Sequence, residues 1–236
     1  MGRALHSIAA LADVAAEKLR RGGRLVYVGA GTSGRLGALD AAECPPTFGV
    51  APSRAIALVA GGPRALHRAV EGAEDDRSAA ARAVAAKRIG ARDLVVGISA
   101  SGTTPFVLAA LTEAHRRGAT TALLTSNPAA RAAADHRVVL ATGAERIAGS
   151  TRMKAGTAAK MALGLLSSAA FVRLGTVRDG RMIALRPASE KLRRRAVRNV
   201  ADLADVSEAA ARRLLSAQGW DVRRAIASAR EEEGRT

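Results

Sequence analysis

The alternation of short apolar runs with stretches of helical character is the feature that most constrains the fold. The runs that we expect to form β-strands are residues 25–28, 55–59, 94–98, 120–125 and 138–140. Between them we expect helices over residues 32–42, 63–71, 77–87 and 104–117. Buried strands that alternate with helices are typical of a parallel sheet covered on both faces. The sequence therefore predicts an α/β fold whose binding loops lie at the carboxyl ends of the strands.

The chain after the last expected strand is mostly helical in character. The stretch "GSTRMKAGTAAKMALGLLSSAAFVRLG" predicts a long apolar helix with Ser150 or Thr151 as its N-cap and Gly175 at its end. Three shorter helices are expected over residues 189–203, 207–216 and 221–230. We therefore predict two domains, a sheet domain over residues 1–186 and a small three-helix domain over residues 187–236.

The length and the cysteine count limit the class of protein. A chain of 236 residues can form one sizeable domain with a small appendage. The polar stretch "SASGTTP" interrupts the longest uncharged run, and Asp13 interrupts the apolar N-terminal stretch, so neither resembles a membrane span or a signal peptide. Cys44 is the single cysteine, which excludes an intrachain disulfide and favours a cytoplasmic location.

The formal net charge of +16 raises the question of a nucleic-acid partner. The arginines are dispersed over many expected helices, and no set of aromatic side chains that could stack on bases accompanies them. We expect no nucleic-acid partner and no membrane partner. The positive field can still attract an anionic small molecule.

Two glycine-rich and hydroxyl-rich loops follow strands and open helices. The first, "GAGTSG", fits the dinucleotide pattern G-x-G-x-x-G. The region of the expected second strand, "RAIALVAGGPRALHRAV", contains no acidic residue before Glu71 to bind a ribose, so the sequence disfavours a dinucleotide. The second, "SASGTTP", contains Ser99, Ser101 and Thr104. Hydroxyl groups and free N–H groups at a helix N-terminus suit a phosphate monoester, and ordinary helix capping is the alternative for either loop alone.

Thr32 and Ser33 on the first loop would grip the same phosphosugar as the second loop. Two carboxylates lie in the neighbouring segments, Glu43 against a pair of prolines and Glu74 within "EGAEDD". The histidines are scattered without a metal-binding spacing, and "GTSGRLG" lacks the elbow of a serine nucleophile. We therefore expect no metal site.

Three longer segments together carry a family resemblance. They are "GAGTSGRLGALDAAECPPTFGV", "AVEGAEDD" and "GSTRMKAGTAAKM". They resemble the signatures of the N-acetylmuramic acid 6-phosphate etherases, members of the sugar isomerase (SIS) domain superfamily related to the glucokinase regulatory protein. The resemblance implies a SIS-type sheet sandwiched by helices, a homodimer, and a cytoplasmic role in amino sugar metabolism and peptidoglycan recycling.

The family cleaves the D-lactyl ether of N-acetylmuramic acid 6-phosphate to N-acetylglucosamine 6-phosphate and D-lactate, by elimination followed by addition of water. The resemblance implies Glu43 and Glu74 as the catalytic pair, with Glu43 as the acid toward lactate and Glu74 as the base at C2. It also implies Lys154 as a cation near the phosphorylated amino sugar, and it implies no metal and no organic cofactor.

The match departs from the family at two places, and two other functions stay open. The family's "ASGRTP" is "ASGTTP" here, with Thr103 in place of arginine, and its "NEKL" is "SEKL" at residues 189–192. Losing a guanidinium can weaken an anion contact. The alternatives are a regulatory SIS protein that binds a phosphosugar without turnover, and an aldose–ketose phosphosugar isomerase.

Overall fold

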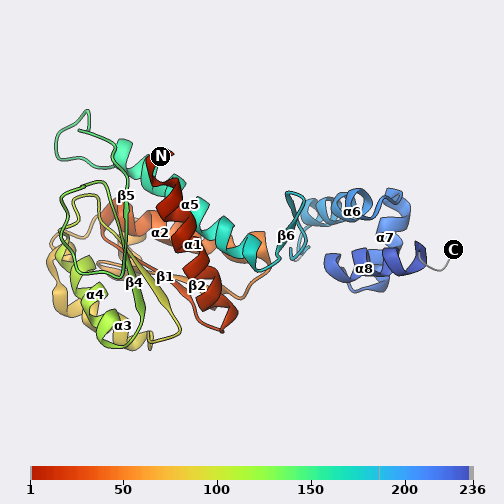
Figure 1. Ribbon diagram of the computed structural model, residues 1–236, viewed down its shortest axis with the longest axis horizontal. Helices are drawn as coiled ribbons and strands as arrows, with labels where there is room; N and C mark the ends of the chain where they lie inside the picture. Colours follow the sequence, from red (N-terminus) through yellow and green to blue (C-terminus); the bar gives the residue numbers. More distant parts are fainter. Residues whose placement is uncertain (1, 186, 234–236) are drawn as a thin grey trace. The chain divides into compact units, whose positions relative to one another are not determined.

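The computed structural model describes residues 2–185 and 187–233 and divides the chain into two compact units. The first unit comprises residues 1–43 and 52–170, and the second comprises residues 44–51 and 171–236. The first contains the sheet, and the second contains the three C-terminal helices (Figure 1).

A five-stranded, entirely parallel sheet forms the centre of the first unit, with strand order β2-β1-β3-β4-β5. The strands are β1 (Leu25–Gly29), β2 (Ala55–Val59), β3 (Leu94–Ile98), β4 (Thr120–Thr125) and β5 (His136–Val139). β1 and β3 are buried along their whole length, because helices cover the sheet on both faces. The predicted α/β fold with a parallel sheet is confirmed.

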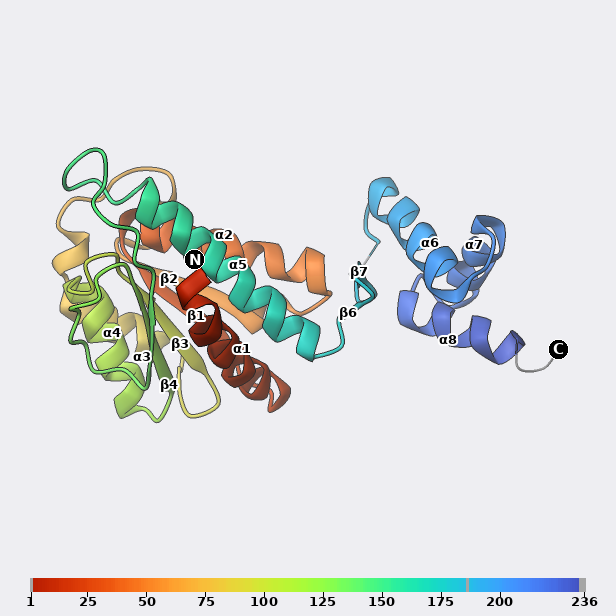
Figure 2. The same ribbon diagram turned by 45° about the horizontal axis from the view of Figure 1, so that its top comes forward.

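The helices of the first unit lie in two layers (Figures 1 and 2). α3 (Arg77–Ala86) and α4 (Pro105–Arg116) pack on one face, where Val26 and Val28 join their apolar side chains in a continuous core. The other face carries α1 (Leu5–Arg20), α2 (Gly31–Phe48) and α5 (Lys154–Arg173). Alternate residues of each strand supply the two faces, so the sheet holds two apolar layers.

The helix expected over residues 63–71 is wrong. That segment holds the short 3₁₀ turn η3 (Gly62–Leu66), and a second one, η4 (Ala73–Asp75), follows; two more are η1 (Gly2–Ala4) and η2 (Pro52–Arg54). Gly61, Gly62 and Gly72 have φ values of 82°, 68° and 70°, which lie in the left-handed region. These left-handed glycines bound the segment at both ends.

α2 continues beyond the expected end at residue 42. Pro45 and Pro46 lie inside the helix, which ends at Phe48. A proline inside a helix removes a backbone donor, but its fixed φ is itself helical, so two adjacent prolines can lie within the last turns. As a result Glu43 belongs to the helix and does not follow it.

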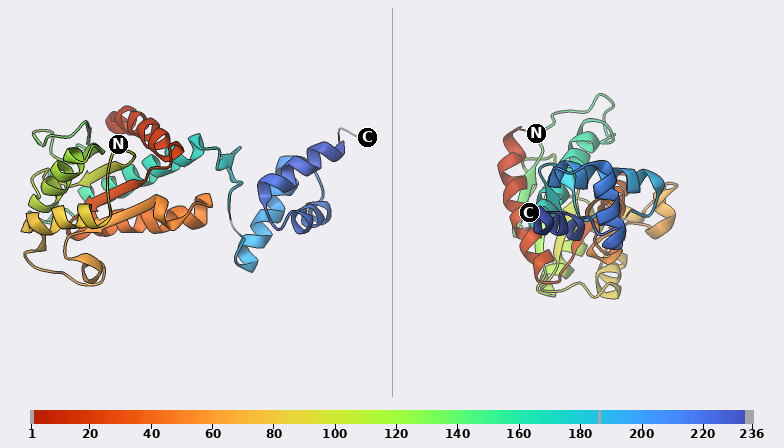
Figure 3. Two further views of the ribbon diagram at one scale, coloured as in Figure 1. Left: turned by 90° about the horizontal axis from the view of Figure 1, so that it is seen from below. Right: turned by 90° about the vertical axis from the view of Figure 1, so that its right-hand side faces the viewer.

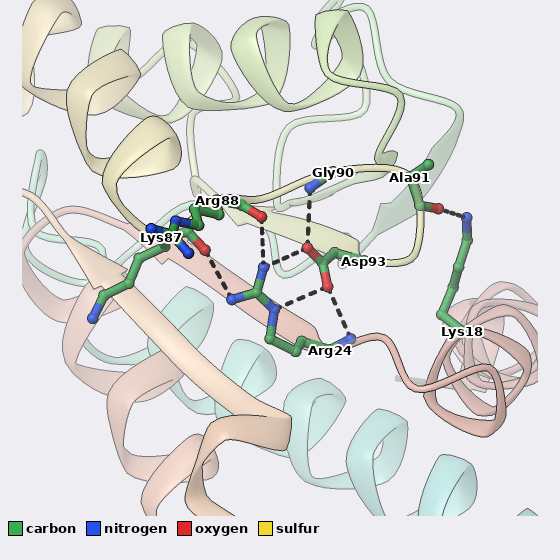
Figure 4. Close-up of polar contacts among 7 residues, drawn as sticks. All are labelled: Lys18, Arg24, Lys87, Arg88, Gly90, Ala91 and Asp93. Carbon is green, nitrogen blue, oxygen red and sulfur yellow. Dashed lines mark hydrogen bonds and ion pairs between the residues drawn. The ribbon is translucent and has the colours of Figure 1, made fainter.

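The amino edge of the sheet is held by an ion pair (Figure 4). Asp93, just before β3, accepts hydrogen bonds from Arg24 Nη2 at 2.6 Å and from Arg24 Nε and the Arg24 backbone N at 3.0 Å each. The same guanidinium donates to the carbonyls of Lys87 and Arg88. Arg24 thus joins the start of β1, the start of β3 and the end of the α3 segment. The binding loops lie at the opposite edge.

The second unit packs three helices around its own core (Figure 3). They are α6 (Glu190–Ala204), α7 (Glu208–Ala217) and α8 (Val222–Glu233). Ser189 and Ser207 cap the first two through their side chains, as the expected starts of these helices predict. Ile183 and Leu185 belong to the same core, next to the hairpin of β6 (Val177–Arg178) and β7 (Arg181–Met182).

Candidate active site

The loops after β1 and β3 begin side by side at the carboxyl edge of the sheet. Gly29, the last residue of β1, is paired with Ile98, the last residue of β3. In the strand order β2-β1-β3-β4-β5, the chain changes direction across the sheet between β1 and β3. Open α/β sheets bind ligands at such a switch point. The two loops that the sequence singled out therefore meet where this fold offers a binding site.

The glycines of the first loop let strand and helix approach closely. A Cβ added at Gly29 would lie 2.6 Å from Gly34 N, and one added at Gly34 would lie 2.6 Å from Gly29 O. Only glycine at both positions allows β1 to turn directly into α2. Thr32 and Ser33 then fall in the first turn of the helix, where backbone N–H groups are free to bind an anion.

The hydroxyl groups of the second loop form a cluster. Ser99 Oγ lies 2.8 Å from Thr104 Oγ1 and 3.3 Å from Ser101 Oγ, and Thr103 Oγ1 donates to Ser101 Oγ at 2.9 Å. Thr104 is the N-cap residue of α4, but its side chain makes no capping hydrogen bond. Its hydroxyl therefore belongs to the cluster and not to the helix. Ser99 is buried and supports the loop, whereas Ser101 is exposed.

A third strand end, which our sequence analysis missed, holds this loop in place. Asn127 Nδ2 donates to the carbonyl of Ser101 at 2.9 Å, and Thr125 Oγ1 donates to the carbonyl of Ala100 at 3.1 Å. The Asn127 side chain also accepts from Ala129 N at 2.9 Å, which fixes its orientation. The signal available in the sequence was "TSNP", a polar group directly after an expected strand.

A small cavity lies next to the two loops. It is lined by residues from α2, the ends of β3 and β4, and the start of α5, among them Ser33, Ala100, Ser126, Thr151 and Gly156. Thr32 is close as well, because its methyl carbon lies 3.5 Å from the position that a Cβ at Gly156 would take. The cavity brings Ser33 to the β4 end and adds two hydroxyl residues, Ser126 and Thr151, that our sequence analysis did not assign to the binding site.

Glu43 and Glu74 are both exposed and stand on different elements of the first unit. Glu43 lies in the second half of α2, and Glu74 lies in η4. Glu74 does not cap the helix that follows, because Asp76 is the N-cap of α3 and accepts from Ala79 N at 2.7 Å. Asp76 thus places a negative charge at the positive end of α3. The Glu74 carboxylate therefore takes no part in capping α3.

The Lys154 side chain contacts the preceding loop. Its Nζ donates to the carbonyl of Ala144 at 2.7 Å, and the residue opens α5 at its exposed end. A ligand that binds the Lys154 ammonium group would have to displace the Ala144 carbonyl as its hydrogen-bond acceptor.

The N-cap expected at Ser150 or Thr151 is wrong. The carboxylate of Glu145 accepts from the backbone N of Lys154 and of Ala155, each at 3.0 Å. These hydrogen bonds at the positive end of α5 hold the pKa of Glu145 below its usual value. A distant acid can take this role because the loop after β5 folds back beside the start of α5 (Figure 2).

Within residues 2–185 and 187–233, no three His, Cys, Asp or Glu side chains come together in a way that would hold a metal ion. In the same ranges, α5 is the one helix long and apolar enough to cross a membrane by length and composition, and 56% of its apolar window is buried inside the protein. Such burial is typical of a core helix.

Comparison with known proteins gives two family models and a set of sequence relatives. The glucokinase regulatory protein N-terminal SIS domain matches residues 7–115, and the SIS domain matches residues 70–169. A protein of Symbiobacterium thermophilum named N-acetylmuramic acid 6-phosphate etherase is 51% identical over 94% of this chain and 74% of its own length. A protein of the same name from Streptomyces avermitilis is 47% identical over 94% of this chain and 72% of its own length.

Solved structures support the fold at lower identity. A putative phosphosugar isomerase of Bacteroides fragilis, described as involved in capsule formation, has a TM-score of 0.55 and 19% identity, over 74% of this chain and 82% of its own. A protein of E. coli, solved in complex with a ligand, has a TM-score of 0.53 and 19% identity, over 75% of this chain and 82% of its own. These likenesses establish the SIS-type architecture of the sheet and its helices.

Proposed function

Because the chain belongs to the family of N-acetylmuramic acid 6-phosphate etherases, we propose a role for each residue of its site in the cleavage of N-acetylmuramic acid 6-phosphate. The enzyme removes the D-lactyl group from C3 and leaves N-acetylglucosamine 6-phosphate and D-lactate. The observation that carries the site assignment is the meeting of two hydroxyl-bearing loops at the switch point of the sheet. An anionic group bound there lies against the positive ends of α2 and α4.

The phosphate occupies this meeting point. Ser101 and Thr104 donate their hydroxyls from the second loop, and Ser33 donates from the first turn of α2. Thr32 and Ser99 support these side chains from below, which agrees with the burial of Ser99. Hydrogen bonds to a doubly charged phosphate are of the strong, charge-assisted kind. This end of the substrate is thereby fixed while the sugar extends toward the carboxylates.

The ether bond breaks by elimination from the open-chain aldehyde. The proton on C2 is acidic because it is adjacent to the C1 carbonyl, so a base can remove it to give an enolate. The C3–O bond then breaks and the C2=C3 double bond forms. The departing lactate oxygen takes up a proton. Water then adds at C3, and a proton returns to C2, so the net change is hydrolysis of the ether.

Glu74 removes the C2 proton and later returns it. Glu43 protonates the lactate oxygen and then accepts a proton from the attacking water. Two positioned carboxyl groups with different proton affinities are sufficient for these steps. The exposure of both side chains supports the assignment, and so does the capping of α3 by Asp76, which leaves Glu74 free of that task.

The active molecule is a homodimer in the cytoplasm, with Lys154 as a cation near substrate. The support for a dimer is an exposed apolar strip on α5, where the Met161 and Leu165 side chains are 48% and 41% exposed. An apolar helical strip of this kind is commonly covered by another chain. A phosphorylated substrate and a single cysteine favour the cytoplasm.

Two assays on one set of variants separate the roles of the glutamates. D-lactate release from N-acetylmuramic acid 6-phosphate is measured beside exchange of the C2 hydrogen in D₂O, for the wild type, Glu43→Gln and Glu74→Gln. Glu71→Gln is the matched control, because it removes an exposed acid from the same segment as Glu74.

Glu74→Gln should abolish both lactate release and C2 exchange. Glu43→Gln should abolish lactate release and retain measurable exchange, because its proton is needed after C2 is deprotonated. Exchange that survives in Glu74→Gln and disappears in Glu43→Gln would reverse the two roles. Lactate release at the wild-type rate from either variant would remove that residue from the catalytic pair.

A further inference from the structure

An open groove of about 840 Å³ lies wholly within the second unit, between β7 and α6. It has no part in the proposed reaction, and its volume is in the range of cavities that hold a ligand. Two acidic side chains line the groove, whereas five basic side chains do so, namely Arg181, Lys191, Arg194, Arg195 and Arg198. The groove therefore has a net positive lining.

The two acids of the groove are already paired. Asp202 Oδ2 lies 2.8 Å from Arg181 Nη2, so this ion pair joins β7 to α6. Glu190 Oε1 lies 3.3 Å from Arg194 Nε within α6. In the described part of the chain, three of the five cations therefore have no carboxylate partner inside the groove.

These three cations share one face of α6. Lys191, Arg195 and Arg198 are four and three residues apart, which places them along one stripe of the helix, and all three are exposed. Arg198 approaches an acid outside the groove, Glu208, at 4.0 Å. Like charges at this spacing disfavour the helix. An anion bound along the stripe would relieve this repulsion, so the face suits a ligand with several negative charges.

The groove offers no surface on which bases could stack. No aromatic side chain is among the described residues that line it. Trp220, the single tryptophan of the chain, is covered instead by Arg193, whose Cζ lies 5.1 Å from the centre of the ring. Proteins that bind single strands combine cations with stacking aromatic side chains. A nucleic acid is therefore a poorer fit to this groove than an anionic peptide.

A buried acceptor in the groove lining narrows the choice of anion further. Asn199 is 5% exposed, and its Nδ2 donates to the carbonyl of Met182 at 2.7 Å. Within residues 2–185 and 187–233 its Oδ1 has no donor, and no fully buried side-chain oxygen there lacks a partner, so Oδ1 is accessible from the groove. Inorganic phosphates offer mainly acceptors. A peptide combines carboxylates with backbone N–H donors, and so satisfies both the cations and this oxygen.

We propose that this groove binds an acidic, extended peptide segment of a partner protein. Carboxylates of the segment pair with Lys191, Arg195 and Arg198, and a backbone N–H donates to Asn199 Oδ1. Alternate side chains of an extended peptide are about 6.6 Å apart, and successive turns of α6 rise by about 5.4 Å, a difference that long basic side chains can absorb. Arginine also binds carboxylates through two parallel hydrogen bonds.

The test measures binding of a fluorescein-labelled peptide of four glutamates alternating with three glycines to the full chain, by fluorescence anisotropy. The double variant Arg195→Gln/Arg198→Gln removes two charges from the groove. Arg212→Gln/Arg213→Gln is the matched control, because it removes the same charge from exposed positions of α7 in the same unit. Emission from Trp220 shows that the second unit of each variant is folded.

The dissociation constant should rise about tenfold or more in Arg195→Gln/Arg198→Gln, because charge-assisted hydrogen bonds are lost. In Arg212→Gln/Arg213→Gln it should rise about twofold at most, since 0.15 M salt screens charges beyond about 8 Å. An equal loss in both double variants would refute a defined site. Absence of binding to the wild type would refute it as well.

Three further probes decide the class of ligand. The same peptide with N-methylated backbone nitrogens should bind more weakly, and equal binding would contradict the role of Asn199. A labelled heptathymidylate that binds more tightly than the peptide, and is lost in Arg195→Gln/Arg198→Gln, would replace the peptide by a nucleic acid. Saturating N-acetylglucosamine 6-phosphate should leave peptide binding unchanged. Displacement of the peptide by this phosphosugar would overturn a separate groove, whether or not lactate release confirms the proposed function.

Discussion

Removal of the Asp93 carboxylate should destabilise the first unit strongly. The Asp93 side chain is 6% exposed and that of Arg24 is 24% exposed, so the pair is largely shielded from water. Asp93 accepts three hydrogen bonds from Arg24 and a fourth from Gly90 N at 3.1 Å. Breaking a buried ion pair by deleting one partner costs about 3–5 kcal/mol, because the other charge is left without compensation. Since Arg24 is one-quarter exposed, we expect Asp93→Ala to cost ~3 kcal/mol.

Urea unfolding followed by circular dichroism at fixed protein concentration measures this loss. Asp93→Asn should be intermediate, because it keeps an acceptor oxygen and loses the charge. Glu17→Ala is the control, since its ion pairs with Arg20 and Arg21 on α1 are exposed to solvent and should contribute far less. A loss below ~1 kcal/mol in Asp93→Ala would refute the argument from burial.

The same pair gives stability a defined pH dependence. Burial raises the pKa of the Asp93 carboxyl, but hydrogen bonds from Arg24 and Gly90 outweigh this, so the pKa lies below its usual value. A depressed pKa in the folded state contributes stability that is present above the unfolded pKa of about 3.9 and is lost as the pH falls through the folded value. The difference between wild type and Asp93→Asn should therefore shrink below about pH 4.

Three further predictions concern the binding loops. Ser101→Ala should raise KM about tenfold or more, with a smaller change in kcat, because it removes a charge-assisted hydrogen bond to phosphate. Steady-state kinetics of lactate release measure both constants, and an unchanged KM would contradict this prediction. Thr103→Arg should lower KM and make it more sensitive to salt, since it adds a guanidinium to the loop; an ionic-strength series tests the sign. Gly34→Ala should weaken both folding and substrate binding, because the new Cβ would lie 2.6 Å from Gly29 O; thermal unfolding unchanged from wild type would refute the close approach.

Most strands and helices followed from sequence pattern because each obeys a local rule. The buried strands are unbroken apolar runs, and the serines before α6 and α7 have the side chains that cap helices. The errors fall where a local rule has an exception or a distant group intervenes. Two prolines fit inside α2, and the cap of α5 comes from Glu145, nine residues before Lys154. Capping rules consider only the few residues next to the helix start, so they do not include Glu145.

The sequence by itself determined the layered α/β architecture, the two hydroxyl-bearing loops and, through three long signatures, the etherase family. Periodicity, glycine spacing and residue type carry this information along the chain. Tertiary structure alone decided that Asn127 holds the second loop and that Asp40 is shielded between Tyr27 and Ser167. These contacts join strand ends and helices far apart in the sequence, because parallel strands bring their carboxyl ends together only once the sheet has formed.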